Sequence, residues 1–190
     1  MKPSSRDYFE QTMLAHLSAS YHFALSIMGH PQNAEDAVQE AYIRAFRAIN
    51  QFSGENSKAW LMVIVRNVCM TQLNQLKGSK VVYVDPQVLK QETHHFQIEQ
   101  AITDATPESK AIELSNLSSQ SKRIHHAISQ LPVEYREVIL LREFQEFNYK
   151  QISEITSLPM GTVMSRLSRA RRDLRKILGS EINKENNHGV

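Results

Sequence analysis

Apolar residues recur at three- and four-residue spacings in the first 78 residues, which is the period of amphipathic helices. The pattern predicts three helices, over residues 8–28, from about Asn33 to Asn50, and from Ser57 to about Leu76. Asn33 and Ser57 are the expected N-caps of the second and third helices, and Phe46 is among the side chains expected to be buried. Short helices are marginal in isolation, so we expect the three to enclose a common core.

A second group of helical patterns begins near Leu117. It predicts four helices, from Leu117 to Leu131, over residues 132–144, over residues 148–156, and along residues 158–174. Between the two groups the periodicity fades, which predicts a linker. The chain is therefore expected to be all-α, with two helical domains at residues 1–78 and 116–180, a flexible linker at 79–115 and a flexible tail at 181–190.

The last two predicted helices have the pattern of a helix-turn-helix. Ile152 and Ile155 give the first of them an apolar inner face, and Leu158 follows as a plug for the turn. Four apolar residues then recur at spacings of four, three and four, namely Val163, Leu167, Ala170 and Leu174. This spacing turns groups that can reach phosphates and base edges outward: Thr162, Ser165, Arg166, Arg169 and Arg172.

Positive charge is concentrated on the last of these helices. The chain has a formal net charge of only +2, whereas residues 161–176 alone carry +5, so the remaining residues sum to −3. Such a local concentration of positive charge suits phosphate binding, and the small net charge of the whole chain conceals it. A basic amphipathic helix with a solvated face is the simpler alternative, and residues 158–174 alone leave it open.

Composition argues against several other classes of protein. The longest apolar run, WLMVIV at residues 60–65, is too short to cross a bilayer, and the first residues lack the apolar stretch of a signal peptide. We therefore expect a cytoplasmic protein without membrane insertion. A single cysteine, Cys69, excludes a disulfide within the chain and is expected in the core. The histidine pairs at residues 94–95 and 125–126 diverge on a helix and lack completing ligands, so we expect no metal site. No Ser/His/Asp, P-loop or paired-carboxylate pattern stands out, so we expect no cofactor and no enzymatic activity.

The second group of helices resembles region 4 of the extracytoplasmic-function (ECF) sigma factors of the σ70 family. The resemblance lies in LPVEYREV, LRE, NY, GTV, SRL and RAR, which stand in the family's order between residues 131 and 171. It implies that the five outward residues of the last helix read the −35 promoter element in the major groove. Four positions depart from the family pattern: Glu146 and Ser157 replace usual glycines, Ser153 a usual alanine, and Met164 a usual lysine or arginine.

The first group resembles region 2 of the same family, in AEDAVQEAYIRAFRAINQF and AWLMVIVRNVCMTQL. Together the two resemblances imply a sigma factor that binds core RNA polymerase, at the β′ clamp helices and the β flap, and directs it to promoter DNA. They also imply an anti-sigma factor as a partner. We expect the chain to be a monomer when free.

A polar stripe runs along the second predicted helix of the first group. Asp36, Glu40 and Arg44 stand four residues apart, with Gln39 beside them. From the residues alone, a solvated face with an internal Glu40–Arg44 pair is the simpler account. The resemblance instead makes these four residues the contact for core RNA polymerase.

By the same resemblance, the loop after this helix and the helix that follows open the promoter and bind its unpaired −10 bases. The expected contacts offer hydrogen-bonding or aromatic groups: Asn50, Ser53, Asn56, Lys58, Trp60, Arg66, Asn67 and Asn74. Trp60 is equally well suited to the core, because the helix that carries it is apolar on most sides.

Two other classes of protein remain as alternatives. A stand-alone helix-turn-helix regulator would account for the last two helices, but it has no need of the polar stripe at residues 36–44. A protein-binding helical adaptor would account for the amphipathic helices, but it has no need of the +5 on residues 161–176. Binding to core RNA polymerase distinguishes both from a sigma factor.

Overall fold

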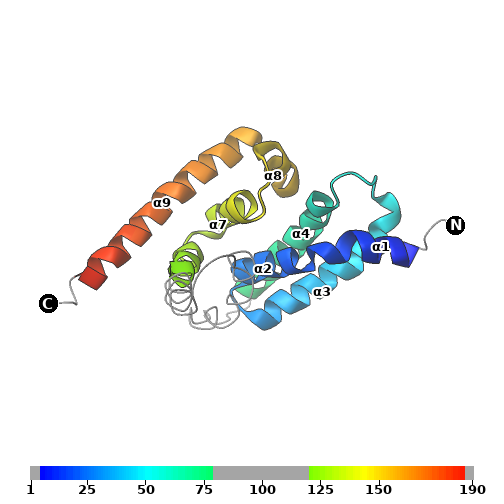
Figure 1. Ribbon diagram of the computed structural model, residues 1–190, viewed down its shortest axis with the longest axis horizontal. Coiled ribbons are helices and arrows are strands. Elements are labelled where there is room, and N and C mark those ends of the chain that lie inside the picture. Colours follow the sequence, from blue (N-terminus) through cyan, green and yellow to red (C-terminus); the bar gives the residue numbers. More distant parts are fainter. Residues whose placement is uncertain (1–4, 79–119, 187–190) are drawn as a thin grey trace, which may run out of the picture.

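The first module of the protein consists of helices (Figure 1). The computed structural model describes residues 5–78 and 120–186. The first module, residues 5–78, contains α1 (Ser5–Met13), the 3₁₀ turn η1 (Leu14–His16), α2 (Leu17–Met28), α3 (Pro31–Ala48), the 3₁₀ turn η2 (Ile49–Gln51) and α4 (Ser57–Gly78). The predicted linker at residues 79–115 lies outside the described residues.

The second module, residues 120–186, is helical as well. It contains a helix at residues 120–129, then α7 (Val133–Ile139), the π-helical segment η3 (Leu140–Phe144), α8 (Tyr149–Thr156) and α9 (Met160–Asn186). No strand occurs in the described residues, so the all-α prediction is confirmed for them. α9 reaches Asn186 and thus extends into the segment predicted to be a flexible tail. Within the same residues, no helix has both the length and the apolar character needed to cross a membrane.

The prediction of one helix over residues 8–28 is wrong, because the chain tightens into η1 between α1 and α2. The turn places the His16 ring against α4, with its Nε2 atom 2.9 Å from the Ser57 hydroxyl. Ser57, expected to cap α4, is thus bonded to His16, and Asn56 takes the capping role. The Asn56 side-chain oxygen accepts a hydrogen bond from the Ala59 amide at 3.1 Å.

The start of α3 also differs from the prediction. α3 begins at Pro31, so Asn33 lies inside the helix and is not its N-cap. Proline suits the first helical position, because the amide hydrogen that it lacks would have no partner there. His30 is the cap, since its Nδ1 atom accepts a hydrogen bond from the Gln32 amide at 3.3 Å.

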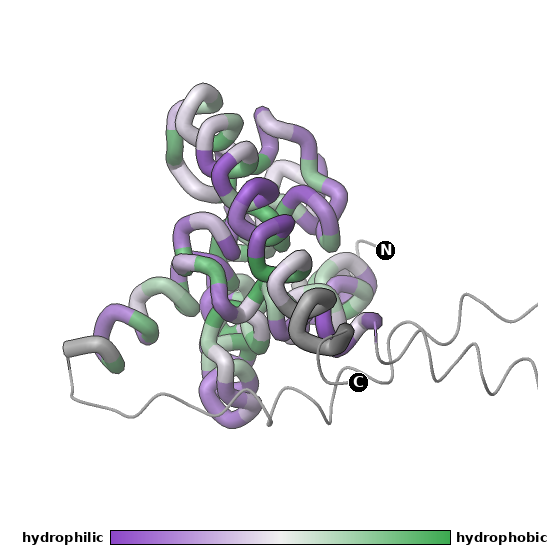
Figure 2. Tube along the Cα trace, turned by 90° about the vertical axis from the view of Figure 1, so that its left-hand side faces the viewer, coloured by the Kyte–Doolittle hydropathy of each residue, from purple (hydrophilic) through white to green (hydrophobic). Residues whose placement is uncertain are grey.

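Buried apolar side chains of both modules form one contiguous cluster. The largest fully buried ones include Met13, Phe23, Ile27, Leu61 and Met62 in the first module and Ile139, Leu141, Ile152, Ile155 and Leu167 in the second. Figure 2 shows apolar and polar residues alternating along the helices, as in amphipathic helices around a core. The prediction that Phe46 is buried is wrong. It is 45% exposed, and its ring meets that of Phe9 edge-on at 5.3 Å.

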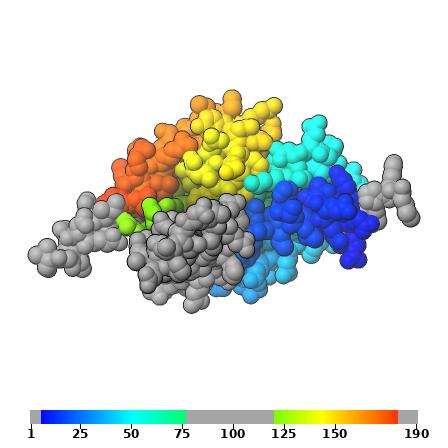
Figure 3. All heavy atoms as spheres, viewed as in Figure 1, coloured from blue at the N-terminus to red at the C-terminus, as the bar shows by residue number. Residues whose placement is uncertain are grey.

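The two modules pack against each other. α8 lies on α4, and α7 contacts α2. In Figure 3 the atoms of the second module around α8 (yellow) adjoin those at the start of α4 (cyan). α9 packs on α7 and α8, on the side away from α3 (Figure 1). The second module therefore covers part of α4, whereas α9 forms an outer edge of the molecule.

Candidate nucleic-acid interface

α8 and α9 form the predicted helix-turn-helix. Asn148 caps α8 in a capping box with Gln151, in which each side chain accepts a hydrogen bond from the other residue's amide at 2.9 Å. Ser157 ends α8 in the left-handed conformation, with φ at 56°. The Ser153 hydroxyl donates to the Leu158 carbonyl across the turn. These bonds fix the direction in which α9 leaves α8.

α9 buries one stripe of residues and exposes the opposite one. Val163, Leu167 and Ala170 are buried, as their spacing predicts. The five predicted −35 residues share the outer face, where Ser165, Arg169 and Arg172 are exposed and Thr162 and Arg166 are half-buried. Met164, at the position where the family pattern has a cation, is 51% exposed on the same helix.

The arginines of α9 differ in how they are engaged. Arg171 bonds Glu143 of η3, with its Nη2 atom 2.7 Å from the carboxylate, and this hydrogen bond raises the pKa of Arg171. Arg172 bonds the carboxylate of the next residue at 3.1 Å. No described residue forms an ion pair with Arg166 or Arg169. Those two guanidinium groups are therefore available to an external anion.

The polar stripe on α3 faces solvent. The predicted ion pair is confirmed, with the Arg44 Nε atom 2.6 Å from the Glu40 carboxylate. Asp36, Gln39 and Arg44 are exposed, and Glu40 is half-buried. Ile43 beside them is 47% exposed. An exposed surface that combines charges of both signs with an apolar neighbour suits a protein partner.

Most of the predicted −10 residues are accessible. Five are exposed, Asn50, Ser53 and Asn56 before α4 and Asn67 and Asn74 along it. Trp60 is half-buried, and its ring centroid lies 5.2 Å from that of Phe52. Trp60 thus belongs to the edge of the core and also borders the loop between α3 and α4.

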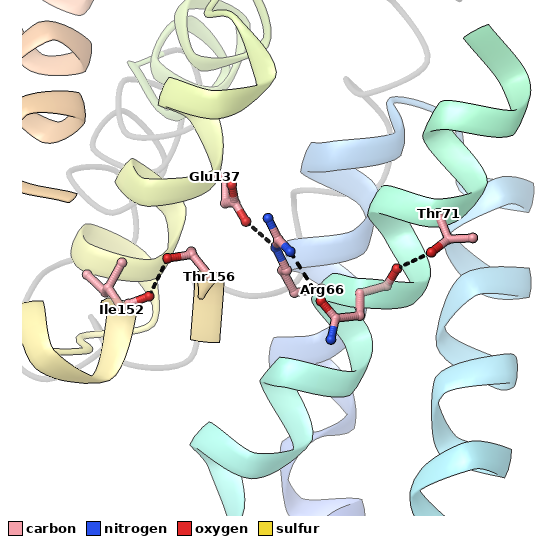
Figure 4. A network of polar contacts seen from close by, with 6 residues as sticks. Arg66, Thr71, Glu137, Ile152 and Thr156 are labelled. Carbon is pink, nitrogen blue, oxygen red and sulfur yellow. Dashed lines mark hydrogen bonds and ion pairs between the residues drawn. The ribbon is translucent and has the colours of Figure 1, made fainter. Parts of the chain in front are cut away.

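The other two predicted −10 residues, Lys58 and Arg66, are engaged by the second module. The Nε atom of Arg66 donates to the Glu137 carboxylate of α7 (Figure 4). The Lys58 ammonium donates to the Gln145 carbonyl at 2.9 Å and lies 5.3 Å from the centroid of the Phe147 ring, within cation–π range. The sequence patterns predict no role for the partners Glu137, Gln145 and Phe147.

Two further polar side chains of the second module reach α2. The Nη1 atom of Arg136 donates to the Ser26 carbonyl at 3.2 Å, and the Gln145 amide donates to the Ala19 carbonyl at 3.3 Å. Burial lowers the pKa of Arg136. The Nε atom of Arg136 and the Oε1 atom of Gln145 are buried and have no hydrogen-bond partner among the described residues. The contact between the modules is thus largely polar at its edge.

One signal in the sequence could have pointed to this contact. Glu137 stands four residues from both Val133 and Leu141, on the apolar side of its helix. A carboxylate at such a position is rarely buried unless a cation pairs with it. The sequence does not say which cation, because Arg66 is 71 residues away along the chain.

Three titratable side chains have structural roles. Burial raises the pKa of Cys69 to about 12, in line with the prediction of a core residue. Burial is also the main cause that lowers the pKa of His16 and of His125. The described residues hold no group of three potential metal ligands. The histidine pair at residues 94–95 lies outside them.

Models of two σ70 regions match the chain in the order of its modules, region 2 at residues 13–78 and region 4 at residues 121–174. The RNA polymerase sigma-H factor of Pseudomonas aeruginosa is 32% identical over 148 residues, which cover 77% of this chain and 74% of that protein. The chain belongs to the ECF sigma factors of the σ70 family. The ECF sigma factor SigW of Bacillus subtilis is 30% identical over 179 residues, 94% of this chain and 92% of that protein.

A solved structure agrees with the fold. The sigma factor RpoE of Bartonella quintana, in complex with the anti-sigma factor NepR, matches with a TM-score of 0.66 and 28% identity, over 90% of this chain and 96% of that one. Family membership excludes the stand-alone regulator and the helical adaptor. The protein is a sigma factor for transcription initiation by RNA polymerase.

Proposed function

We propose that this sigma factor binds core RNA polymerase through α3, reads the −35 element through α9 and opens the −10 element with α4 and the preceding loop. The polymerase contacts are Asp36, Gln39, Glu40 and Arg44 against the β′ clamp helices, while the second module meets the β flap. The −35 contacts are Thr162, Ser165, Arg166, Arg169 and Arg172. The −10 contacts are Asn50, Ser53, Asn56, Lys58, Trp60, Arg66, Asn67 and Asn74.

One observation carries the proposal. The exposed residues of the α3 stripe and the arginines of α9 belong to different modules, and the two helices that carry them lie apart, on opposite sides of the molecule (Figure 1). A protein partner and duplex DNA can therefore bind at the same time, as a promoter-directing subunit requires. The guanidinium groups of Arg166 and Arg169, which form no ion pair with any described residue, suit phosphate or guanine edges.

Regulation by an anti-sigma factor is part of the proposal. It is supported by the Bartonella quintana RpoE structure, in which the sigma factor is held by an anti-sigma factor. We expect a monomer in the cytoplasm when the chain is free, acting without a cofactor and without catalytic chemistry of its own. The promoter is opened by binding energy alone.

The test is transcription with purified core RNA polymerase on fragmented genomic DNA. The wild-type chain should yield discrete run-off transcripts. The double variant Asp36→Ala/Glu40→Ala should bind core at least about tenfold more weakly, because two charged contacts are lost, yet should still bind duplex DNA through α9. Glu35→Ala is the control, since this exposed carboxylate stands next to the stripe and its loss should leave core binding unchanged. No binding of the wild-type chain to core would refute the proposal.

A further inference from the structure

The loop of residues 52–56, between η2 and α4, carries two of the proposed −10 contacts, Ser53 and Asn56. Both side chains are exposed, as are Gly54 and Glu55 beside them. The backbone is left-handed at two places, with φ at 89° at Gly54 and 45° at Asn56. An exposed loop of this kind needs contacts from other elements to keep one shape, and a fixed shape lowers the entropic cost of binding.

The N-terminal segment supplies contacts near both ends of this loop. α1 packs against η2 and against α4, which lie on either side of the loop (Figure 1). The Tyr8 hydroxyl is 3.9 Å from the place where a Cβ atom of Gly54 would lie. At the other end, the Nε2 atom of His16 is 2.9 Å from the Ser57 hydroxyl. Residues from the start of the chain therefore border the loop at two points.

The contact of His16 is the directed one of the two. His16 belongs to η1, the turn that separates α1 from α2 and brings the ring against α4. Burial and the charge of Lys58 lower the pKa of His16. The ring is therefore neutral, and its Nε2 atom shares one hydrogen bond with the hydroxyl. Ser57 is half-buried and is the first residue of α4. His16 thus fixes the point at which the loop joins α4.

The residue before Ser57 presents its side chain in a defined orientation. The Oδ1 atom of Asn56 accepts a hydrogen bond from the Ala59 amide at 3.1 Å, and no described residue bonds its Nδ2 atom. An asparagine side chain has one accepting and one donating end, so the loop presents a donor to solvent. A donor selects bases whose accessible edge carries an acceptor. The direction of this donor depends on where Ser57 is held, one residue further along the chain.

We infer that His16 is a positioning residue for −10 recognition: through Ser57 it holds the loop in the conformation in which the Asn56 amide reads an unpaired base. The inference rests on the proposed −10 role of the loop and deepens it. His16 acts without touching DNA. Its loss should therefore lower the discrimination between bases, whereas the general affinity for DNA, which depends on cations and phosphates, stays unchanged.

The test uses holoenzyme assembled from the full chain and core RNA polymerase. The probe is a fork-junction DNA from a promoter that the wild type transcribes, with a single-stranded −10 element in which each position carries each of the four bases in turn. Asn56→Asp identifies the position that the loop reads, because aspartate keeps the cap and replaces the outward NH₂ group with an oxygen atom. The preferred base should change at that position.

His16→Gln and His16→Asn form a matched pair for the measurement at that position. The terminal amide of glutamine lies about where the histidine Nε2 atom lies and reaches the Ser57 hydroxyl, whereas asparagine is one methylene shorter. His16→Asn should lower the affinity ratio between the preferred and the least preferred base about fivefold, as for the loss of one hydrogen bond. His16→Gln should keep the wild-type ratio. Ser57→Ala should match His16→Asn, and the double variant should lose no more, since both changes remove the same bond.

Tyr42→Phe is the control for a general loosening of the N-terminal segment. The Tyr42 hydroxyl donates to the Met13 carbonyl at 3.2 Å, so its loss frees the end of α1 from α3 without touching the loop. This variant should have a lower unfolding temperature and an unchanged ratio between bases. Thermal unfolding of every variant checks that the chain is folded at the temperature of the binding assay.

The outcomes separate the inference from the proposed function. If His16→Asn discriminates between bases as well as His16→Gln does, His16 does not position the loop and the inference is refuted. An equal loss of discrimination in Tyr42→Phe refutes it too, because loosening of α1 would then explain the effect. In both cases the proposed −10 role of the loop stands. If Asn56→Asp changes the preference at no −10 position although the holoenzyme binds the fork, the loop reads no base, and its proposed role fails together with the inference.

Discussion

The two helices proposed to meet promoter DNA, α4 and α9, present their cations in opposite ways. On α4, Lys58 and Arg66 are bonded to groups of the other module. On α9, Arg166 and Arg169 have no ion pair with any described residue. The arginines of α9 are thus open to duplex DNA, whereas the two cations of α4 are covered by the second module. If α4 binds the −10 element as proposed, Lys58 and Arg66 must first exchange their partners in the second module for DNA, whereas −35 binding by α9 needs no such exchange.

The largest expected effect tests the open side of this comparison. The double variant Arg166→Ala/Arg169→Ala should weaken binding to a promoter duplex about 100-fold, because each lost contact to a base edge or phosphate is worth about 1–3 kcal/mol. Fluorescence anisotropy with a duplex from a transcribed promoter measures the affinity. Arg171→Ala is the control, since its guanidinium is bound to Glu143, and it should cost only about threefold. Equal losses would mean that general charge on α9 accounts for binding.

A smaller effect is expected from restoring a cation on the same helix. Met164→Lys should strengthen duplex binding about fivefold and steepen its salt dependence by about one unit, since one more phosphate is neutralised. Met160→Lys is the comparison, because Met160 is 52% exposed and Met164 51%. Met160 begins α9, and a cation there is disfavoured by the helix dipole. A loss of affinity in Met164→Lys would instead indicate that the thioether contacts an apolar group such as a thymine methyl.

The helices of both modules were predictable because they depend on local spacing. The apolar stripe of α9 and the Asn148 cap follow from residues within a few turns of each other. The Glu40–Arg44 pair follows from a four-residue separation. One cap was predicted wrongly because a more distant group decides it. Ser57 lost its capping role to Asn56 because His16, 41 residues earlier, approaches its hydroxyl.

The docking of the modules could not be predicted from the same patterns. Arg66 was predicted to contact the −10 DNA, and no residue in its own helix identifies Glu137 as its partner. The contact joins residues 71 positions apart across the linker, and periodicity carries no information over that span. A carboxylate on the apolar side of a helix predicts that a cation pairs with it. Which cation does so is decided by the tertiary structure.

The smallest expected effect concerns two residues that replace family glycines. Glu146 and Ser157 both adopt positive φ, at 62° and 56°, one beside the covered face of α4 and the other in the turn before α9. A left-handed conformation costs a side-chain-bearing residue about 1–2 kcal/mol, while glycine adds about 0.5–1 kcal/mol of chain entropy to the unfolded state. Ser157→Gly and Glu146→Gly should therefore each stabilise the fold by roughly 0.5 kcal/mol.

Urea unfolding measures these small changes, and Ser168→Gly supplies the opposite sign. Ser168 is exposed in the middle of α9, where glycine should cost about 0.5 kcal/mol relative to serine. The same chemical change would then stabilise at the turn and destabilise in the helix, which isolates backbone conformation as the cause. If Ser157→Gly destabilised as much as Ser168→Gly, the left-handed turn would carry no strain.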